Sequence, residues 1–133
     1  MHIFYYFWNE NSAADIIEAF TALGHNYVRI SYALPNKDSD PAFEAQVHSL
    51  VQQQPFDLIF RFDYFPILSK IVMENGIPYA AWIYDCPNLT IYSKTITNPC
   101  NYLFLFDHHM MLLAKKLGAV HTFHLPLAVN TSR

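Results

Sequence analysis

The sequence predicts a doubly wound α/β domain, in which helices cover both faces of a mostly parallel sheet of five to six strands. Three observations lead to this fold class. Segments with the character of strands and of helices alternate along the 133 residues. Several strand segments are apolar throughout, as strands buried on both faces are. The three glycines, Gly24, Gly76 and Gly118, each fall at a helix end before a strand, where a left-handed residue is needed.

The expected strands share β-branched and aromatic residues and lie at residues 2–8, 27–33, 57–62, 78–84, 101–106 and, as a possible sixth, 120–125. The expected helices have apolar residues three to four positions apart and lie within residues 12–23, 41–54, 66–75 and 110–117. Ser12 begins a capping box before the first helix, and Ser39 or Asp40 caps the second. Pro41 and Pro66 occupy first helical positions, where a missing amide costs no hydrogen bond.

Residues 86–100 interrupt this alternation between the fourth and fifth strands. They contain Pro87, Pro99 and several β-branched residues, among them Thr90, Ile91, Thr95 and Ile96, and they show no helical stripe. We expect a short or irregular helix with a long loop here, and loops of that length inside a compact domain often serve a function.

The composition excludes several classes of protein. The chain is 53% hydrophobic but only 14% charged, against about a quarter in an ordinary globular chain, so a partner or a second domain is expected to cover part of its surface. The net charge is −3 with no basic stripe, which argues against a nucleic-acid partner. No apolar run approaches the roughly 18 to 20 residues of a membrane span. The beginning of the chain lacks the features of a signal peptide, so Cys86 and Cys100 are expected to be free thiols in the cytoplasm.

Three expected strands end in the same way. Asp63, Asp85 and Asp107 each follow an aromatic-rich strand, and they are 22 residues apart (85 − 63 and 107 − 85). One strand–helix period returns a parallel chain to the same edge, so all three carboxylates should lie at the carboxyl edge of the sheet, where open α/β sheets bind ligands. Asn9 and Asn11, which follow the first strand, should share that edge.

Structural roles compete with binding roles at these positions. Asp63 and Asp107 precede helices and are suited to capping them, whereas Asp85 precedes a turn and either shapes it or contacts a ligand. His108 and the adjacent His109 point different ways on a helix, so we expect polar contacts or a general base rather than a metal site.

Other chemical signatures are missing or ambiguous. A glycine-rich phosphate loop and a G-x-S-x-G elbow are both absent from the sequence. The numerous aromatic residues are expected mostly in the core, although Trp8, Tyr64 and Phe65 at strand ends are candidates for stacking on a sugar.

Three segments together resemble a known family. They are PYAAWIYDCP at residues 78–87, FLFD at residues 104–107 and LPLAVN at residues 125–130, in that order. The sequence is similar to the N-terminal domain of bacterial glycosyltransferase-like proteins of the spore-maturation (CgeB-like) type. The resemblance covers residues 56–130 best.

This resemblance implies a Rossmann-like fold for residues 1–130, as the acceptor-binding half of a GT-B transferase. The donor-binding domain, which would hold the nucleotide sugar, would follow residues 131–133, and without it this chain is expected to be inactive. No metal or other cofactor is implied. Asp85 becomes the first candidate for the base or an acceptor contact, supported by Asn9, Asn11, Asp63, Asp107 and His108.

A module without enzymatic activity, of the flavodoxin-like or receiver-like kind, is the alternative. Asp63 after the third strand matches the phospho-acceptor position of a receiver. A receiver also needs an acidic pair after the first strand, where the chain has Asn9, Glu10 and Asn11. The fifth strand is followed by Asp107, His108 and His109 rather than by the required lysine.

Overall fold

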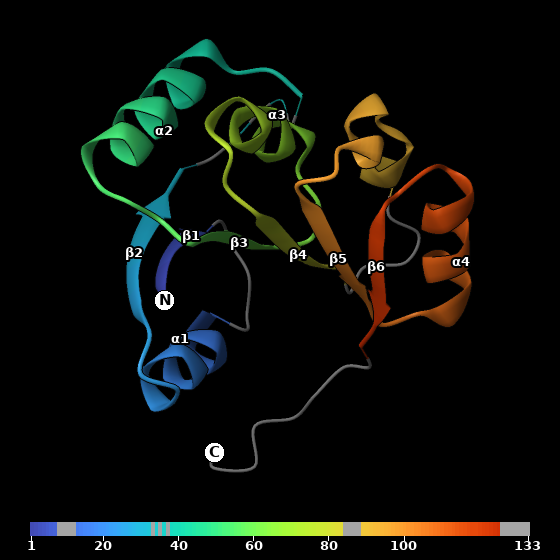
Figure 1. Ribbon diagram of the computed structural model, residues 1–133, viewed down its shortest axis with the longest axis horizontal. Helices are drawn as coiled ribbons and strands as arrows, with labels where there is room; N and C mark the ends of the chain where they lie inside the picture. Colours follow the sequence, from blue (N-terminus) through green and yellow to red (C-terminus); the bar gives the residue numbers. More distant parts are fainter. Residues whose placement is uncertain (8–12, 33, 35, 37, 84–88, 126–133) are drawn as a thin grey trace.

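A computed structural model describes residues 1–7, 13–32, 34, 36, 38–83 and 89–125, and within them a single parallel sheet has the order β2-β1-β3-β4-β5-β6 (Figure 1). Its strands are β1 (His2–Phe7), β2 (Asn26–Ser31), β3 (Leu58–Phe62), β4 (Tyr79–Ile83), β5 (Asn101–Leu105) and β6 (His121–His124). The α-helices are α1 (Ala13–Ala22), α2 (Pro41–Gln53), α3 (Pro66–Asn75) and α4 (His108–Lys116). Every described strand pairs in parallel with its neighbours, so the predicted fold class is confirmed.

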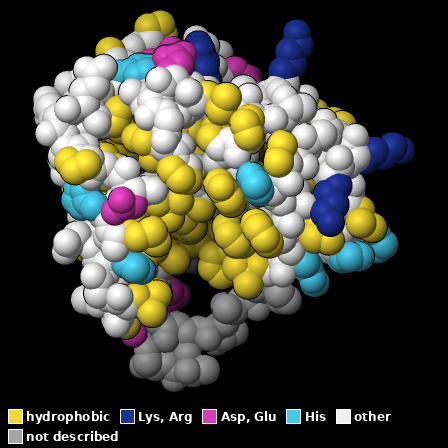
Figure 2. All heavy atoms as spheres, viewed as in Figure 1, with side chains coloured by type: hydrophobic (Ala, Val, Ile, Leu, Met, Phe, Trp, Pro, Cys, Tyr) yellow, Lys and Arg dark blue, Asp and Glu magenta, His cyan; other side chains and the backbone are white. Residues whose placement is uncertain are grey.

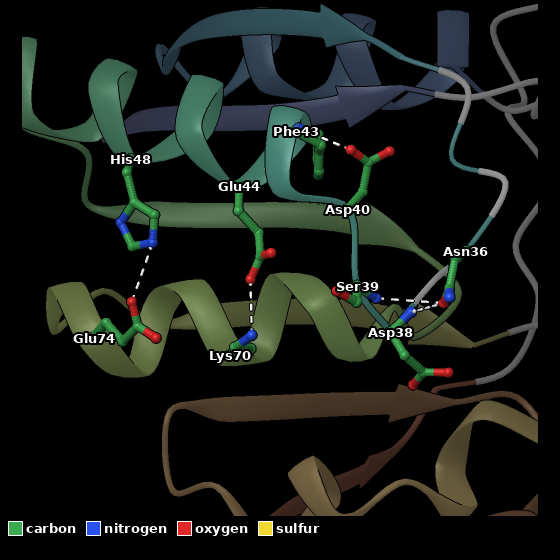
Figure 3. Close-up of polar contacts among 9 residues, drawn as sticks. All are labelled: Asn36, Asp38, Ser39, Asp40, Phe43, Glu44, His48, Lys70 and Glu74. Atoms are coloured by element: carbon green, nitrogen blue, oxygen red, sulfur yellow. Dashed lines mark hydrogen bonds and ion pairs between the residues drawn. The ribbon is translucent and has the colours of Figure 1, made fainter.

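The helices begin and end largely where side-chain chemistry predicts. Asp40 caps α2, with its Oδ1 accepting from the amide of Phe43 at 3.1 Å (Figure 3). Gly76 ends α3 in the left-handed conformation, with a φ of 67° that a Cβ would make unfavourable. The capping box expected at Ser12 lies outside the described residues.

One ion pair and one histidine–carboxylate contact join α2 to α3 (Figure 3). Lys70 Nζ lies 2.9 Å from Glu44 Oε1, and His48 Nε2 lies 3.1 Å from Glu74 Oε2. These side chains are partly exposed, so each pair contributes little to stability and serves mainly to align the two helices.

The two faces of the sheet are covered unequally. α2, α3 and α4 pack on one face around a large core that includes Ile59, Ile83 and Leu103, and α1 packs on the other face (Figure 1). The second core is smaller, and its helical members all come from α1. Helices thus lie on both faces as predicted, but one face carries most of them.

Two short 3-10 helices, η1 (Leu89–Tyr92) and η2 (Lys94–Thr97), occupy the crossover between β4 and β5. The irregular crossover predicted from the sequence is therefore confirmed. A buried polar network anchors η2 to the domain. In it, Asn101 Nδ2 donates to the carbonyl of Thr95 at 2.8 Å, and Ser69 Oγ donates to Asn101 Oδ1 at 2.6 Å.

Among the residues that the structure describes, no helix has the length and apolarity to cross a bilayer, and the longest of them, α2, has 13 residues.

Candidate functional site

The strand order places the natural ligand crevice between β1 and β3. Strands β1 and β3 are hydrogen-bonded neighbours, but the helices that follow them, α1 and α3, lie on opposite faces of the sheet (Figure 1). The connections diverge at this point, and open α/β sheets bind ligands at the carboxyl ends of strands where the connections diverge in this way. The described part of the candidate site therefore consists of the residues that follow β3, since residues 8–12 after β1 lie outside the described residues.

Asp63 comes directly after β3 and lies at this crevice. Its φ of 63° is left-handed, a conformation that aspartate and asparagine tolerate better than other residues with a side chain. Its amide donates to the carbonyl of Trp82 at 2.8 Å, and its Oδ1 is buried. Asp63 does not cap α3, because the N-cap position belongs to Phe65, which makes no side-chain capping bond. The capping alternative for Asp63 is therefore wrong.

Arg61 is a buried cation beside the same crevice, and the sequence analysis missed it. It is only 4% exposed, its Nη1 donates to the carbonyl of Tyr6 at 3.5 Å, and its guanidinium lies 4.7 Å from the ring centroid of Phe65. A guanidinium keeps its charge in proteins, so the end of β3 carries a fixed positive charge against aromatic rings. Alternation along β3 gave a signal for this, because Arg61 shares a face with Ile59, which is fully buried.

The phenol of Tyr79 holds the chain in place after β3. Burial raises its pKa well above the usual range, an effect that the amide of Phe65 and the charge of Arg61 oppose and that Tyr64 and Asp63 reinforce. Tyr79 therefore stays protonated. Its hydroxyl accepts from the amide of Phe65 at 3.0 Å and donates to the carbonyl of Asp63 at 3.5 Å, which holds the backbone on both sides of Tyr64.

Asp107 and His108 lie at the same edge, beyond β5. Asp107 caps α4, with its Oδ1 accepting from the amides of His109 at 2.8 Å and Met110 at 3.4 Å. His108 is exposed, and its ring lies edge-on to His124 with 5.6 Å between the centroids. Among the described residues, no group of three histidine, cysteine or acidic side chains could hold a metal ion.

The aspartates were predicted at one edge of the sheet, and Asp63 and Asp107 lie there. Strands β3, β4 and β5 are neighbours in that order, so about 10 Å of sheet separates the ends of β3 and β5. One small ligand at Asp63 would therefore not also reach the capping carboxylate of Asp107. Asp85, Asn9 and Asn11 lie outside the described residues, and their roles stay predictions.

Two of the three aromatic residues suggested for stacking on a sugar, Tyr64 and Phe65, are unsuited to that role. Tyr64 is completely buried and Phe65 is 2% exposed, so neither ring presents a face to a ligand, and Trp8 lies outside the described residues. Both rings pack in the core beneath α2 and α3 instead. The turn after β3 thus offers a ligand polar groups rather than ring faces.

Comparisons with known proteins do not assign this site. No family model, curated protein or solved structure matches the chain. The resemblance to the CgeB-like glycosyltransferases therefore stays a prediction. What the structure adds is the geometry at the carboxyl ends of β1 and β3.

Proposed function

We propose that the chain is the acceptor-binding domain of a cytoplasmic glycosyltransferase of the GT-B type. It would work with a second domain that holds the nucleotide-sugar donor, and it would be inactive alone. The observation that carries the proposal is the position of Asp63, a carboxylate that follows β3 two residues after the buried cation of Arg61, where the connections from β1 and β3 diverge.

The side chains at the end of β3 suit a polyhydroxylated acceptor. A carboxylate oxygen accepts hydrogen bonds from hydroxyl groups, and since Asp63 Oδ1 is buried, its other oxygen, Oδ2, would bind a sugar hydroxyl group. Tyr79 and the backbone bonds around Asp63 hold the turn in one conformation, which lowers the entropy lost when an acceptor binds. Asp85 stays the candidate for the base that removes the proton from the acceptor hydroxyl.

The test is a titration of the ¹⁵N-labelled chain with a panel of methyl pyranosides, followed by amide chemical shifts. We expect saturable shifts around residues 61–65, and we expect Asp63→Asn to weaken binding about 10- to 100-fold, since hydrogen bonds to a charged group contribute about 1.5–3 kcal/mol. Asparagine tolerates the left-handed backbone, so the variant should fold.

Asp57→Asn is the matched control, because it removes the same charge at the other end of β3. Asp57 Oδ2 accepts from the amide of His2 at 2.8 Å, away from the crevice. UDP-glucose should leave the spectrum unchanged, since the donor belongs to the second domain. Equal losses in the two variants, or tight binding of UDP-glucose to this chain, would contradict the proposal.

One observation favours a receiver-like regulatory module as the second candidate. The first five strands follow the order 2-1-3-4-5, which flavodoxin-like and receiver domains share, and Asp63 stands after the third strand. Incubation with acetyl phosphate and Mg²⁺, followed by intact mass, separates the candidates. A stable gain of one phosphoryl group that Asp63→Asn removes would favour the receiver, and an unchanged mass would favour the acceptor-binding domain.

A further inference from the structure

Two histidines from different elements meet at the carboxyl edge of the sheet. His108 begins α4 directly after β5, and His124 ends β6, the strand next to β5. Their ring centroids lie 5.6 Å apart, with 73° between the ring planes. Figure 2 shows histidine side chains, in cyan, gathered on the surface at the lower right, over the lower ends of α4 and β6 in Figure 1. The partner of His108 is therefore His124, which the fold brings close, rather than the adjacent His109.

The separation of the two rings fits the chelation of one metal ion. An imidazole nitrogen binds Zn²⁺ at about 2.0–2.1 Å, which places each ring centroid about 3.2 Å from the ion, so two rings at a tetrahedral angle have centroids about 5.2 Å apart. The observed 5.6 Å is about 0.4 Å longer, and a small rotation of these exposed side chains closes the difference. Each nitrogen lone pair lies in the plane of its ring, so two rings inclined at 73° can both direct one at the same ion.

The hydrogen bond of His124 sets the protonation of its ring as a metal ligand needs it. Its Nε2 lies 3.0 Å from the carbonyl oxygen of Phe106. A carbonyl only accepts, so Nε2 carries the proton, and Nδ1 of the neutral ring keeps its lone pair. Histidines that bind metals ordinarily donate their other ring N–H to a carboxylate or a backbone carbonyl, which fixes the ring and makes it a better ligand. This bond is a second observation, independent of the ring separation, that points to Nδ1 of His124 as a ligand.

The charges around the pair are compatible with a bound cation. The N-terminus of α4 carries about half a positive elementary charge, which repels a metal ion. The carboxylate of Asp107 lies at the same end of α4 and offsets this charge, because its Oδ1 accepts from the amides of His109 and Met110. The cations of α4, Lys115 and Lys116, lie in its last turn, about 10 Å along the helix from His108.

The geometry indicates two protein ligands rather than three. The ring centroid of His109 lies 6.3 Å from that of His108, about 1 Å beyond the separation that shared ligation requires. Within the part of the chain that the structure describes, no three histidine, cysteine or acidic side chains are grouped to hold an ion. A tetrahedral ion on His108 and His124 would keep two positions for water or for an atom of a bound molecule. Imidazole suits Zn²⁺, Cu²⁺ and Ni²⁺, whereas Mg²⁺ and Ca²⁺ prefer oxygen ligands.

We propose that His108 and His124 bind a divalent transition-metal ion of the Zn²⁺ class, with Nδ1 of His124 and one ring nitrogen of His108 as the protein ligands. The resemblance to glycosyltransferases implies no metal, so this site goes beyond it. The ends of β5 and β6 are at least about 10 Å of sheet away from Asp63. The site needs neither a sugar nor a second domain, so its failure would leave the proposed function standing.

The test is a calorimetric titration of the chain, prepared without a polyhistidine tag, with ZnCl₂. We expect one ion to bind per chain. His108→Gln and His124→Gln should each weaken the affinity at least about 10-fold, since even the hydrogen-bond partners of metal ligands contribute 10- to 100-fold. The double variant should lose little more than either single variant, because one imidazole alone cannot chelate. Glutamine can still donate to the Phe106 carbonyl, and circular dichroism checks that the variants fold.

His109→Gln and His121→Gln are the matched controls, because each removes a histidine from the same two elements, α4 and β6. Both should leave the affinity for Zn²⁺ unchanged, and MgCl₂ should give no heat of binding. Two-bond ¹H–¹⁵N spectra of the imidazole rings give a readout specific to the proposed ligand atom. Nδ1 of His124 should shift when Zn²⁺ is added, while its Nε2 keeps the proton.

Three results would overturn the proposal. One is the absence of binding at Zn²⁺ concentrations up to about 1 mM. Another is an equal loss of affinity in the site variants and the controls, or binding that the double variant retains, since either would place the ion on other residues. The third is a proton on Nδ1 rather than on Nε2 of His124 in the presence of Zn²⁺.

Discussion

Replacing Asn101 by alanine should lower the free energy of unfolding by about 3 kcal/mol, because this side chain joins three elements through bonds buried from water. Asn101 begins β5 and is 1% exposed. Its Nδ2 donates to the carbonyl of Thr95 in η2 at 2.8 Å and to the hydroxyl of Tyr64 at 3.2 Å. Its Oδ1 accepts from Ser69 Oγ in α3 at 2.6 Å.

The magnitude follows from which bonds are lost and which remain. Three hydrogen bonds disappear, at about 1 kcal/mol each. Their partners keep other bonds: Tyr64 with Thr95 Oγ1 at 2.5 Å, Ser69 with Asn98 Nδ2 at 3.0 Å, and the Thr95 carbonyl with the amide of Asn98 at 2.9 Å. No partner is left without a bond, so we do not expect the larger penalty of orphaned buried groups.

Urea unfolding followed by circular dichroism measures the effect. With a slope of about 2 kcal/mol per molar urea, the midpoint should fall by about 1.5 M while the slope stays constant. Tyr64→Phe removes two of the network's bonds and should lose about 2 kcal/mol. Gln52→Ala removes an exposed amide from α2 and should change stability by less than about 0.5 kcal/mol. A loss for Asn101→Ala as small as that of Gln52→Ala would refute the view that this network anchors the crossover.

Two further predictions concern the helix cap and alkaline pH. Asp107→Ala should lower the free energy of unfolding by about 1 kcal/mol, whereas Asp107→Asn should lower it by only about a few tenths, because asparagine can still accept from the amides of His109 and Met110. Thermal unfolding measures both variants, and equal losses of stability would contradict the capping role of Asp107. Burial raises the pKa of Tyr64 and Tyr79 in the folded chain above the ordinary value of 10.0, so the folded state holds protons that the unfolded state loses. The contribution of these protons to the free energy of unfolding should therefore be fully present below about pH 10 and should be lost as the pH rises further. The loss should be less steep in Tyr64→Phe. A loss with the same slope in that variant would contradict the role of Tyr64.

Most of the fold could be predicted because its signals are local. The cap at Asp40, the proline at the start of α2 and the left-handed Gly76 act within one helical turn of the residues that they terminate. The apolar strands predicted a parallel sheet, and the equal spacing of three aspartates predicted one shared carboxyl edge, at which Asp63 and Asp107 lie. The boundaries were less accurate, since α4 begins at His108 rather than at Met110.

The site could be predicted only in outline. Asp85 was the first candidate from its motif, whereas the strand order draws attention to Asp63, because the crevice depends on which strands are neighbours and on the face each crossover takes. Arg61 was overlooked since a charged residue in a strand is ordinarily exposed, and the alternation along β3 that indicated its burial was not used; in the structure, Phe65 and Tyr6 pack around it.

The sequence by itself determined the elements, their order, their parallel arrangement and the edge of the sheet that carries the acidic residues. Only the tertiary structure decided between which strands the connections diverge, and that Arg61, two residues before Asp63, is buried. The physical reason is the distance along the chain over which each interaction acts. Caps, turns and hydrophobic periodicity act over a few residues, whereas strand pairing and burial depend on contacts between segments far apart in the chain.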